Sequence, residues 1–158
     1  MIEAPDELVE AIMAASRALV AIAAVSIESA PVEVTLNQFR ALLVLSTGGP
    51  LLMSRLAQAV KQSPSSATRL VERLERKALV VRRPSPTSRR STELHLTAAG
   101  ATLVDTVMAT RRRELVTVIE AIPEPRRLAV LAAFEDFATA AGEPFGPSTY
   151  KAKASAAG

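Results

Sequence analysis

The stretch that decides the fold is residues 51–97, LLMSRLAQAVKQSPSSATRLVERLERKALVVRRPSPTSRRSTELHLT. Its pattern predicts two short helices, at about 54–60 and 64–77, followed by a strand, a loop rich in Pro, Ser and Arg with its tip at 84–88, and a return strand in which Leu94 and Leu96 alternate. Ser63 is suited to cap the second helix, and Pro64 fits a first helical position. Two short helices joined by a tight turn and followed by a β-hairpin predict a winged helix-turn-helix.

The second of these helices has one apolar and one polar face. The apolar residues recur at helical spacing and are Ala67, Leu70, Val71, Leu74 and Ala78. At about 100° per residue the opposite side carries Ser65, Arg69, Glu72, Arg73 and Arg76. A helix with one dry face and one Ser/Arg face suits the major groove of DNA, where arginine is the commonest reader of guanine. We therefore interpret residues 64–77 as a recognition helix.

Three groups of residues are candidates for contact with DNA. On the recognition helix they are Ser65, Ser66, Thr68, Arg69 and Arg73, with Arg69 placed first because it lies nearer the helix end that enters the groove. On the hairpin, or wing, Arg89 and Arg90 would reach a minor groove or its phosphates. Arg55 on the preceding helix is a candidate for one phosphate. The alternative is a solvated basic surface with an ordinary Glu72–Arg76 pair.

The charge distribution separates the middle of the chain from its ends. Residues 48–97 hold ten Lys or Arg and three Glu, a net charge of +7, whereas the remainder holds nine basic and thirteen acidic residues, a net charge of −4. A basic centre in an acidic frame is typical of a nucleic-acid binder. Solvated surface arginine explains the charge alone equally well.

Composition excludes several other classes of protein. The chain has 158 residues and no Cys, so disulfides, thiolate metal sites and thiol sensing are excluded, and a cytoplasmic location is the simplest fit. One histidine, His95, makes a zinc site and other metal sites unexpected. No nucleophile, phosphate loop or carboxylate cluster indicates an enzyme, and no cofactor is expected. We find no signal peptide and no apolar run of the roughly 18 residues that a membrane span needs.

Long helices flank the central stretch. We expect helices at about 6–29, 35–46, 98–122 and 126–141, separated by Pro and Gly and with Thr35 and Thr97 as caps, which gives a mainly α fold with a small β-hairpin wing. For the arginine run 111–113 we expect a solvated face or intersubunit pairing. The candidate apolar contacts of the last two helices include Val118, Ile119, Leu128, Leu131, Phe134 and Phe137. The domain organisation follows as a winged helix-turn-helix at 35–97, a helical dimerisation region at 1–34 and 98–141, and a mobile tail at 142–158. The end helices exceed what one small domain needs to cover its core, which favours a homodimer.

The residues resemble a known family. Four segments are similar to the MarR (multiple antibiotic resistance regulator) family: Asn37–Leu42, Leu56-Ala57, Ser66–Glu75 and Leu96–Gly100. The resemblance covers roughly residues 6–142. It implies a triangular homodimer with interlocked N- and C-terminal helices that represses or activates transcription, and whose DNA binding a small phenolic or lipophilic effector often weakens.

Three departures from the family pattern have physical consequences. Ser88 replaces the aspartate that usually precedes the wing arginine by two residues, so the wing tip should be more positive and less rigid. Lys61 stands where the turn often has Gly, and it would need a positive φ there. The missing cysteine excludes the peroxide-sensing mechanism of some members.

Two other functions remain open from the sequence. One is a non-specific or architectural DNA-binding protein, which needs only the charge. The other is a winged-helix module for protein interaction or ligand sequestration. An effector pocket would lie between the long helices and the winged unit, lined by residues such as Leu19, Phe39 and Leu42, and nothing polar identifies its ligand. Neither the operator, the target genes nor the direction of regulation follows from the sequence.

Overall fold

The computed structural model describes residues 6–142, apart from the side chains of Arg89 and Arg90. The elements, in chain order, are α1 (Asp6–Glu28), α2 (Leu36–Gly48), β1 (Leu51–Leu52), α3 (Met53–Ala59), α4 (Pro64–Arg76), β2 (Val80–Ser85), β3 (Ser88–Leu96), α5 (Ala98–Ala121) and α6 (Glu124–Ala140). This mainly helical winged-helix fold is the expected fold class, and the expected elements are found within a few residues of their expected bounds. The tail predicted from residue 142 lies almost wholly outside the described residues.

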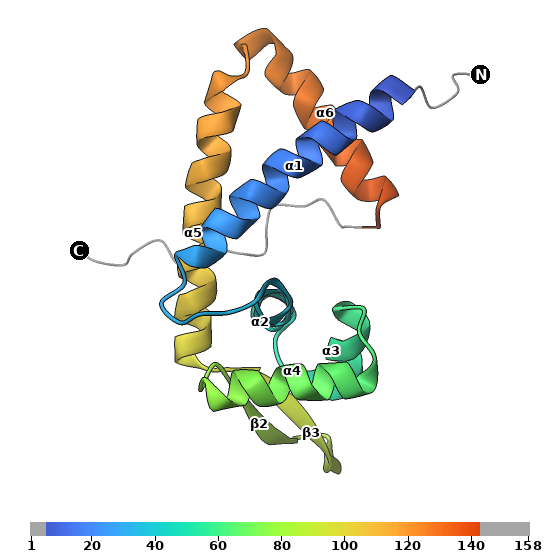
Figure 1. The fold of residues 1–158 in the computed structure, drawn as a ribbon. Coiled ribbons are helices and arrows are strands. Elements are labelled where there is room, and N and C mark those ends of the chain that lie inside the picture. The colour runs from blue at the N-terminus through green and yellow to red at the C-terminus, as the bar shows by residue number, and fades with distance from the viewer. Residues whose placement is uncertain (1–5, 143–158) are drawn as a thin grey trace.

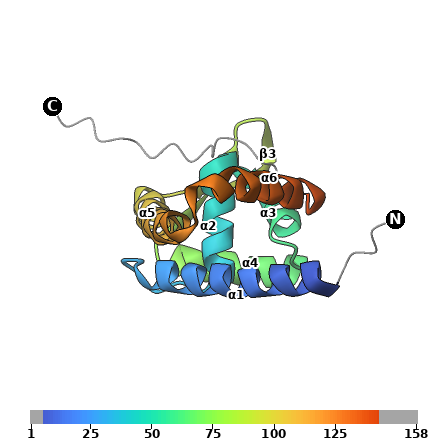
Figure 2. The same cartoon turned by 90° about the horizontal axis from the view of Figure 1, so that it is seen from above.

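The molecule has two parts that share one helix. The winged-helix unit, residues 35–97, lies at the bottom of Figure 1, with α2 above α4 and the β2–β3 hairpin below. The outer helices, which are α1, α6 and residues 111–121 of α5, rise above it. Figure 2 shows α1 and α6 passing over the winged-helix unit at different places. Because α5 begins directly after the unit, at Ala98, and ends among the outer helices, it joins the two parts.

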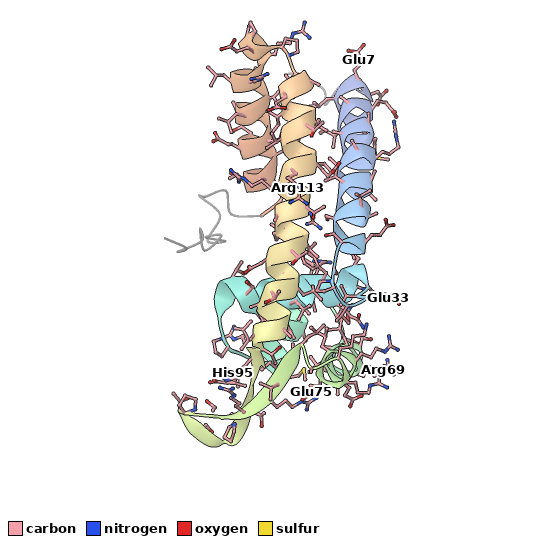
Figure 3. The ribbon with its side chains drawn as sticks, turned by 90° about the vertical axis from the view of Figure 1, so that its left-hand side faces the viewer. Glu7, Glu33, Arg69, Glu75, His95 and Arg113 are labelled. Atoms are coloured by element: carbon pink, nitrogen blue, oxygen red, sulfur yellow. The ribbon has the colours of Figure 1, made fainter. Side chains whose placement is uncertain are left out.

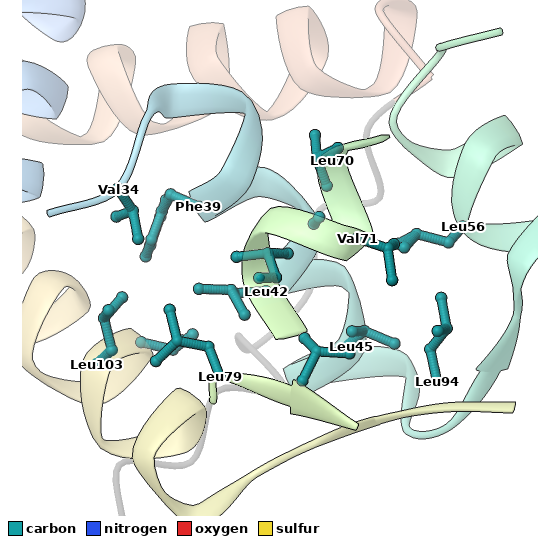
Figure 4. Close-up of a cluster of buried hydrophobic side chains, with 14 of the residues drawn as sticks. Val34, Phe39, Leu42, Leu45, Leu56, Leu70, Val71, Leu79, Leu94 and Leu103 are labelled. Atoms are coloured by element: carbon teal, nitrogen blue, oxygen red, sulfur yellow. The ribbon is translucent and has the colours of Figure 1, made fainter. Parts of the chain in front are cut away.

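The core lies inside the winged-helix unit and the first half of α5. Its largest fully buried side chains include Phe39, Leu42, Leu56, Leu74, Leu79, Leu94 and Leu103, several of which are drawn in Figure 4. These residues come from α2, α3, α4, the turn before β2, β3 and α5, so each of these segments contributes apolar side chains to a single cluster. Burial of one such side chain stabilises the fold by about 1.5–3 kcal/mol. The apolar spacing predicted for α4 is confirmed for Ala67, Leu70, Val71 and Leu74.

The sheet is small and antiparallel. Its strand order is β1-β3-β2, with Leu51 opposite Leu94 and Val80 opposite Leu96. The expected loop at 84–88 is shorter than predicted, because β2 continues through Ser85 and β3 begins at Ser88. The pairing shifts between Pro84 and Ser85. An irregular pairing of this kind is a means of accommodating Pro, which cannot donate to the ladder.

Side-chain caps define the helix starts. Thr35 and Gln38 form a reciprocal capping box at α2, Ser63 Oγ accepts from the Ser66 N–H at α4, and Thr97 Oγ1 accepts from the Gly100 N–H at α5. All three caps satisfy N–H groups that have no partner within the helix. The caps predicted at Thr35, Ser63 and Thr97 are therefore confirmed.

Two non-glycine residues adopt left-handed backbone. Lys61 has φ 53°, as its place in the turn predicts, and Ala78 has φ 56°. We expected Ala78 on the apolar face of α4, but the helix ends at Arg76 and Ala78 is exposed. The Ala78 N–H donates to the Glu75 carbonyl and the Leu79 N–H donates to the Leu74 carbonyl. This paired bonding closes the helix and turns the chain into β2.

The contact between α5 and the winged-helix unit depends on Gly100. A Cβ at this position would lie 2.3 Å from the Leu79 carbonyl oxygen and 2.7 Å from Leu96 Cδ1. Thr97 strengthens the same junction, since its hydroxyl donates to the Ala78 carbonyl at 2.8 Å. The start of α5 is therefore fixed tightly against the hairpin.

The outer helices differ from the prediction in their burial. Val118 and Ile119 of α5 are exposed rather than buried, as are Leu128, Leu131, Phe134 and Phe137 of α6. Within α1 only Ser26 is fully buried. Among residues 6–142 these side chains stay exposed, so the spacing identified apolar positions but not what covers them.

One helix meets the length and composition of a membrane span, contrary to the sequence-based expectation. An 18-residue window of α1 has a mean hydropathy of 1.9 and at most two charged residues. The sequence reading missed it because Arg17 interrupts the apolar run. The observation is weak evidence for a membrane, because α1 also packs on α5.

Arg111 joins α1, α2 and α5. Its Nε donates to the buried Ser26 Oγ of α1 at 3.1 Å, and its guanidinium carbon lies 5.2 Å from the centre of the Phe39 ring of α2. Burial lowers the pKa of Arg111, and Nη2 has no hydrogen-bond partner among the described residues. The sequence had suggested a solvated or intersubunit role for residues 111–113, so this inward position of Arg111 is a correction.

Candidate nucleic-acid interface

The recognition helix α4 presents its polar face at the end of the molecule opposite the outer helices. Ser65, Arg69 and Arg73 are exposed, while Ser66 and Thr68 are partly buried. Figure 3 shows Arg69 on the side of α4 away from the wing. All five predicted residues are therefore brought together on one helix of 13 residues whose opposite face is buried in the core.

Local hydrogen bonds orient the hydroxyl groups at the start of α4. Ser63 Oγ lies 3.0 Å from Ser66 Oγ and 3.3 Å from Ser65 Oγ. Thr68 Oγ1 donates to the Pro64 carbonyl at 2.9 Å. Because a hydroxyl also has two acceptor lone pairs, Thr68 can still accept a hydrogen bond. The first turn thus offers a cluster of hydroxyl groups at the helix end that helix-turn-helix proteins direct toward bases.

A groove of about 340 Å³ runs along one flank of α4. It is lined by Thr35, Asn37, Gln38, Gln62, Ser66, Arg69, Leu70 and Arg73. Two guanidinium groups and three side-chain amides contribute to the lining, and none of these residues is acidic. The groove can therefore take an anion or a hydrogen-bond acceptor.

The other flank of α4 faces the wing. Glu75 Oε2 accepts from Arg82 Nε at 3.1 Å, which ties α4 to β2. At the hairpin, Ser85 Oγ donates to Glu93 Oε1 at 2.9 Å and lies 3.0 Å from Thr87 Oγ1. Glu93 Oε2 is 3.5 Å from His95 Nε2. A carboxylate from the return strand thus organises the wing, although Ser88 replaces the aspartate expected there.

The remaining predicted residues are dispersed. Arg89 and Arg90 lie in β3, and their side chains are outside the part that the structure describes. Arg55 is exposed on α3. Of the three residues named for an effector pocket, Phe39 and Leu42 are buried in the core, whereas Leu19 is 43% exposed on α1, and the pocket stays a prediction. No group of three metal-binding side chains occurs within residues 6–142.

Sequence reasoning missed the second wall of the groove. Asn37 and Gln38 precede α4 by more than 25 residues, and neither stands out by composition. The capping pattern Thr-x-x-Gln was the available signal, because it places the start of α2 and hence Asn37 on its first turn. What the pattern could not show is that α2 begins beside α4.

The comparisons with known proteins agree with this geometry. A model of the MarR family matches residues 33–91. The structure of RV1404 from Mycobacterium tuberculosis is 37% identical, with a TM-score of 0.83 over 90% of this chain and 98% of that one. The chain belongs to the MarR family.

Two more distant structures share the fold. A MarR-family protein from Bacillus stearothermophilus is 22% identical, with a TM-score of 0.78 over 87% of this chain and 95% of that one. BpsR from Bordetella bronchiseptica, whose DNA binding is regulated by 6-hydroxynicotinic acid, is 19% identical, with a TM-score of 0.59 over 82% and 98%. No curated protein matches this MarR-family chain in sequence. Membership makes it a DNA-binding regulator of transcription by fold, and MarR proteins are in general not enzymes.

Proposed function

We propose that this MarR-family protein is a sequence-specific repressor that binds a palindromic operator in the cytoplasm as a homodimer. The observation that carries the proposal is α4, because it sets Ser65, Arg69 and Arg73 on an exposed face while its other face anchors the core. Arg69 reads a guanine, and Ser65, Ser66, Thr68 and Arg73 contact bases and phosphates along the same helix. Arg89 and Arg90 of the wing and Arg55 of α3 contact the backbone or the minor groove.

The outer helices form the dimer. Apolar side chains exposed on α1, α5 and α6, such as Val20, Ile119 and Phe134, would be covered by the same helices of a second copy. Residues 6–34 and 98–141 are thus the dimerisation region, and residues 35–97 the DNA-binding region. The two recognition helices then address successive major grooves, which requires half-sites about one helical turn, roughly 10 bp, apart.

Regulation by a small molecule is the finer part of the proposal. BpsR, which shares this fold, is a protein whose DNA binding is regulated by 6-hydroxynicotinic acid. In this chain a lipophilic or phenolic effector would lie between the outer helices and the winged-helix unit, near Leu19, Phe39 and Leu42. Since Phe39 and Leu42 are buried in the structure, such a site requires the outer helices to move.

Selection of bound sequences from a random duplex pool tests the proposal. A palindromic consensus is expected, and Arg69→Ala should weaken binding to it by about 1–3 kcal/mol and relax the preference at one position. Arg126→Ala, which removes an equally exposed arginine from α6, is the matched control and should bind as wild type does. Wild-type affinity and base preference in Arg69→Ala would overturn the role of Arg69.

A second comparison separates specific from architectural binding. At physiological salt a sequence-specific regulator binds its operator at least about 10³-fold more tightly than a random duplex. A ratio near one would instead favour a non-specific DNA-binding protein. Failure to bind any duplex would favour the interaction or sequestering module.

A further inference from the structure

The groove beside α4 is lined by two arginine side chains, Arg69 and Arg73, whose guanidinium groups donate no hydrogen bond within the described part of the structure. Ser66, Arg69, Arg73 and Lys77 are spaced by three or four residues and therefore follow one flank of α4, the flank toward α2. Lys77 lies at the end of this row. Its Nζ donates to the Glu33 carbonyl and, at 3.1 Å, to Gln38 Oε1. This bonding ties the end of α4 to the capping box of α2.

Arg69 and Arg73 differ from Lys77 in having no acceptor. Within residues 6–142 neither guanidinium takes part in a hydrogen bond or ion pair, and both line the groove. Of the two carboxylates on α4, Glu75 binds Arg82 on the other flank, and Glu72 does not line the groove. Two neighbouring cations without a carboxylate make this groove a place where an anion is favoured.

The opposite wall supplies neutral donors. Asn37 is exposed on the first turn of α2, and Gln62 is partly buried in the turn between α3 and α4. Neither side chain has a hydrogen-bond partner among the described residues, so both amide groups are available. Two guanidinium groups and two amides around about 340 Å³ are a donor set suited to a tetrahedral oxyanion.

The position of the groove identifies the anion. In Figure 3 the wing lies on one side of α4, while Arg69 and Glu33 lie on the other. A duplex whose major groove admits α4 has a sugar-phosphate strand along each side of that helix. The wing meets one strand. We propose that the groove binds a phosphate of the other strand, with Asn37 and Gln62 as DNA-contacting residues alongside Arg73, while the five N–H donors of Arg69 serve both this phosphate and the guanine.

This inference rests on the proposed function and assigns it a further contact. Each winged-helix unit holds the major groove by both walls, with the wing on one and α2 with the turn on the other. Contacts to phosphate carry no sequence information. Asn37 and Gln62 therefore contribute affinity and orientation, and base preference comes from the exposed end of α4.

Matched charge substitutions test the assignment. Asn37→Asp and Gln62→Glu each place a carboxylate in the groove with almost no change of shape. Gln58→Glu makes the same substitution at an exposed site on α3 that does not line the groove. We expect each groove variant to bind operator and random duplex about tenfold more weakly, with the ratio of the two unchanged, and Gln58→Glu to bind within about twofold of wild type.

Salt dependence supplies a second readout. The introduced carboxylate cancels one of the arginine charges that neutralise phosphate, so the magnitude of the slope of log K against log salt concentration should fall by about 0.9 per protomer. Unchanged slopes in Asn37→Asp and Gln62→Glu, or losses no larger than in Gln58→Glu, would overturn the inference. A changed operator-to-random ratio would also overturn it, because the groove would then read bases. Failure of the wild-type protein to bind any duplex would instead overturn the proposed function itself.

Side-chain amide NMR signals identify the source of the phosphate. The chain has one Asn and three Gln, so each amide pair can be followed individually. A random duplex should shift the signals of Asn37 and Gln62 more than that of Gln58. Inorganic phosphate alone should not saturate these shifts at millimolar concentration. Saturation by inorganic phosphate would indicate a site for a small free anion and would overturn the assignment to the DNA backbone.

Discussion

The winged-helix unit and the outer helices are both rich in apolar residues, yet only the first covers them within one chain. Leu42 and Leu74 are fully buried, whereas Leu128 of α6 is 78% exposed. The winged-helix unit buries its side chains from several sides because its elements cross one another, whereas the second half of α5 extends away from the core, and α6, which turns back at Pro123, buries none of its residues. The difference teaches that apolar spacing predicts which residues will be covered but not by which chain.

The largest effect should come from the core of the winged-helix unit. Leu42→Ala leaves a cavity among α2, α4 and α5, and it should lower the free energy of unfolding by about 2–5 kcal/mol at any protein concentration. Leu128→Ala, the same substitution on an outer helix, is the control and should change little when the protein is dilute. Chemical denaturation at two protein concentrations measures both. Equal losses in the two variants would contradict the proposed division between the parts.

The junction between α5 and the winged-helix unit should be nearly as sensitive to substitution as the core. Gly100→Ala introduces a Cβ 2.3 Å from the Leu79 carbonyl, and because that backbone atom cannot rotate away, α5 must shift. We expect a loss of about 3 kcal/mol, at the upper end of the usual cost of overpacking. Ala101→Gly, one residue further along α5, removes a Cβ instead and should cost about 1 kcal/mol. Thermal unfolding followed by circular dichroism compares them, and a loss in Gly100→Ala no greater than in Ala101→Gly would refute the tight junction.

The outer helices should respond through association rather than folding. Phe134 is 45% exposed, so a second copy can bury about half of its side chain, worth roughly 1 kcal/mol in each protomer. Phe134→Asp should therefore weaken dimerisation by at least about 2 kcal/mol, or roughly thirtyfold in Kd. Sedimentation velocity measures the change, and an unchanged helical spectrum shows that the winged-helix unit stays folded. A dimer of wild-type stability would show that α6 lies outside the interface.

The smallest effect should be a gain. Ala78 holds φ at 56°, a conformation that costs an L-residue about 1–2 kcal/mol and glycine almost nothing. Ala78→Gly should raise the unfolding free energy by about 1 kcal/mol, because the release of strain exceeds the added entropy of the unfolded chain. Ala129→Gly, inside α6, should have the opposite sign. A loss of stability in both variants would contradict the assigned backbone conformation.

The winged-helix unit could be predicted because its signals are local. The capping residues Thr35, Ser63 and Thr97 indicate where three helices start. Lys61 indicates the turn, and the alternation of Leu94 and Leu96 indicates the return strand. These features depend on residues within one turn of each other. The hairpin tip was placed less well, since Pro84 was expected to end β2 and the shifted pairing accommodates it instead.

Features that depend on distant segments could not be predicted. Arg111 belongs to a run of three arginines that the sequence predicts to be solvated or paired between subunits. In the structure it lies beside Ser26 and Phe39, which are 85 and 72 positions earlier in the chain. The groove beside α4 is another example, because Asn37 and Gln62 meet only once α2 is placed. Exposure of α6 follows from its direction after Pro123, which no spacing pattern encodes. The wing arginines stay a prediction.

The helix α5 extends without a break from Gly100, which lies close to Leu79 and to Leu96 of β3, to Ala121 among the outer helices. At 1.5 Å per residue its 24 residues form a lever about 36 Å long. A tilt of one degree at the far end displaces the other by ~0.6 Å over that length. About five degrees is then equivalent to the 3.4 Å rise of one base pair. In the proposed homodimer, small adjustments where two copies meet would thereby be converted into a change of register on DNA, and the stiffness of a single helix would set how much variation in operator spacing the protein tolerates.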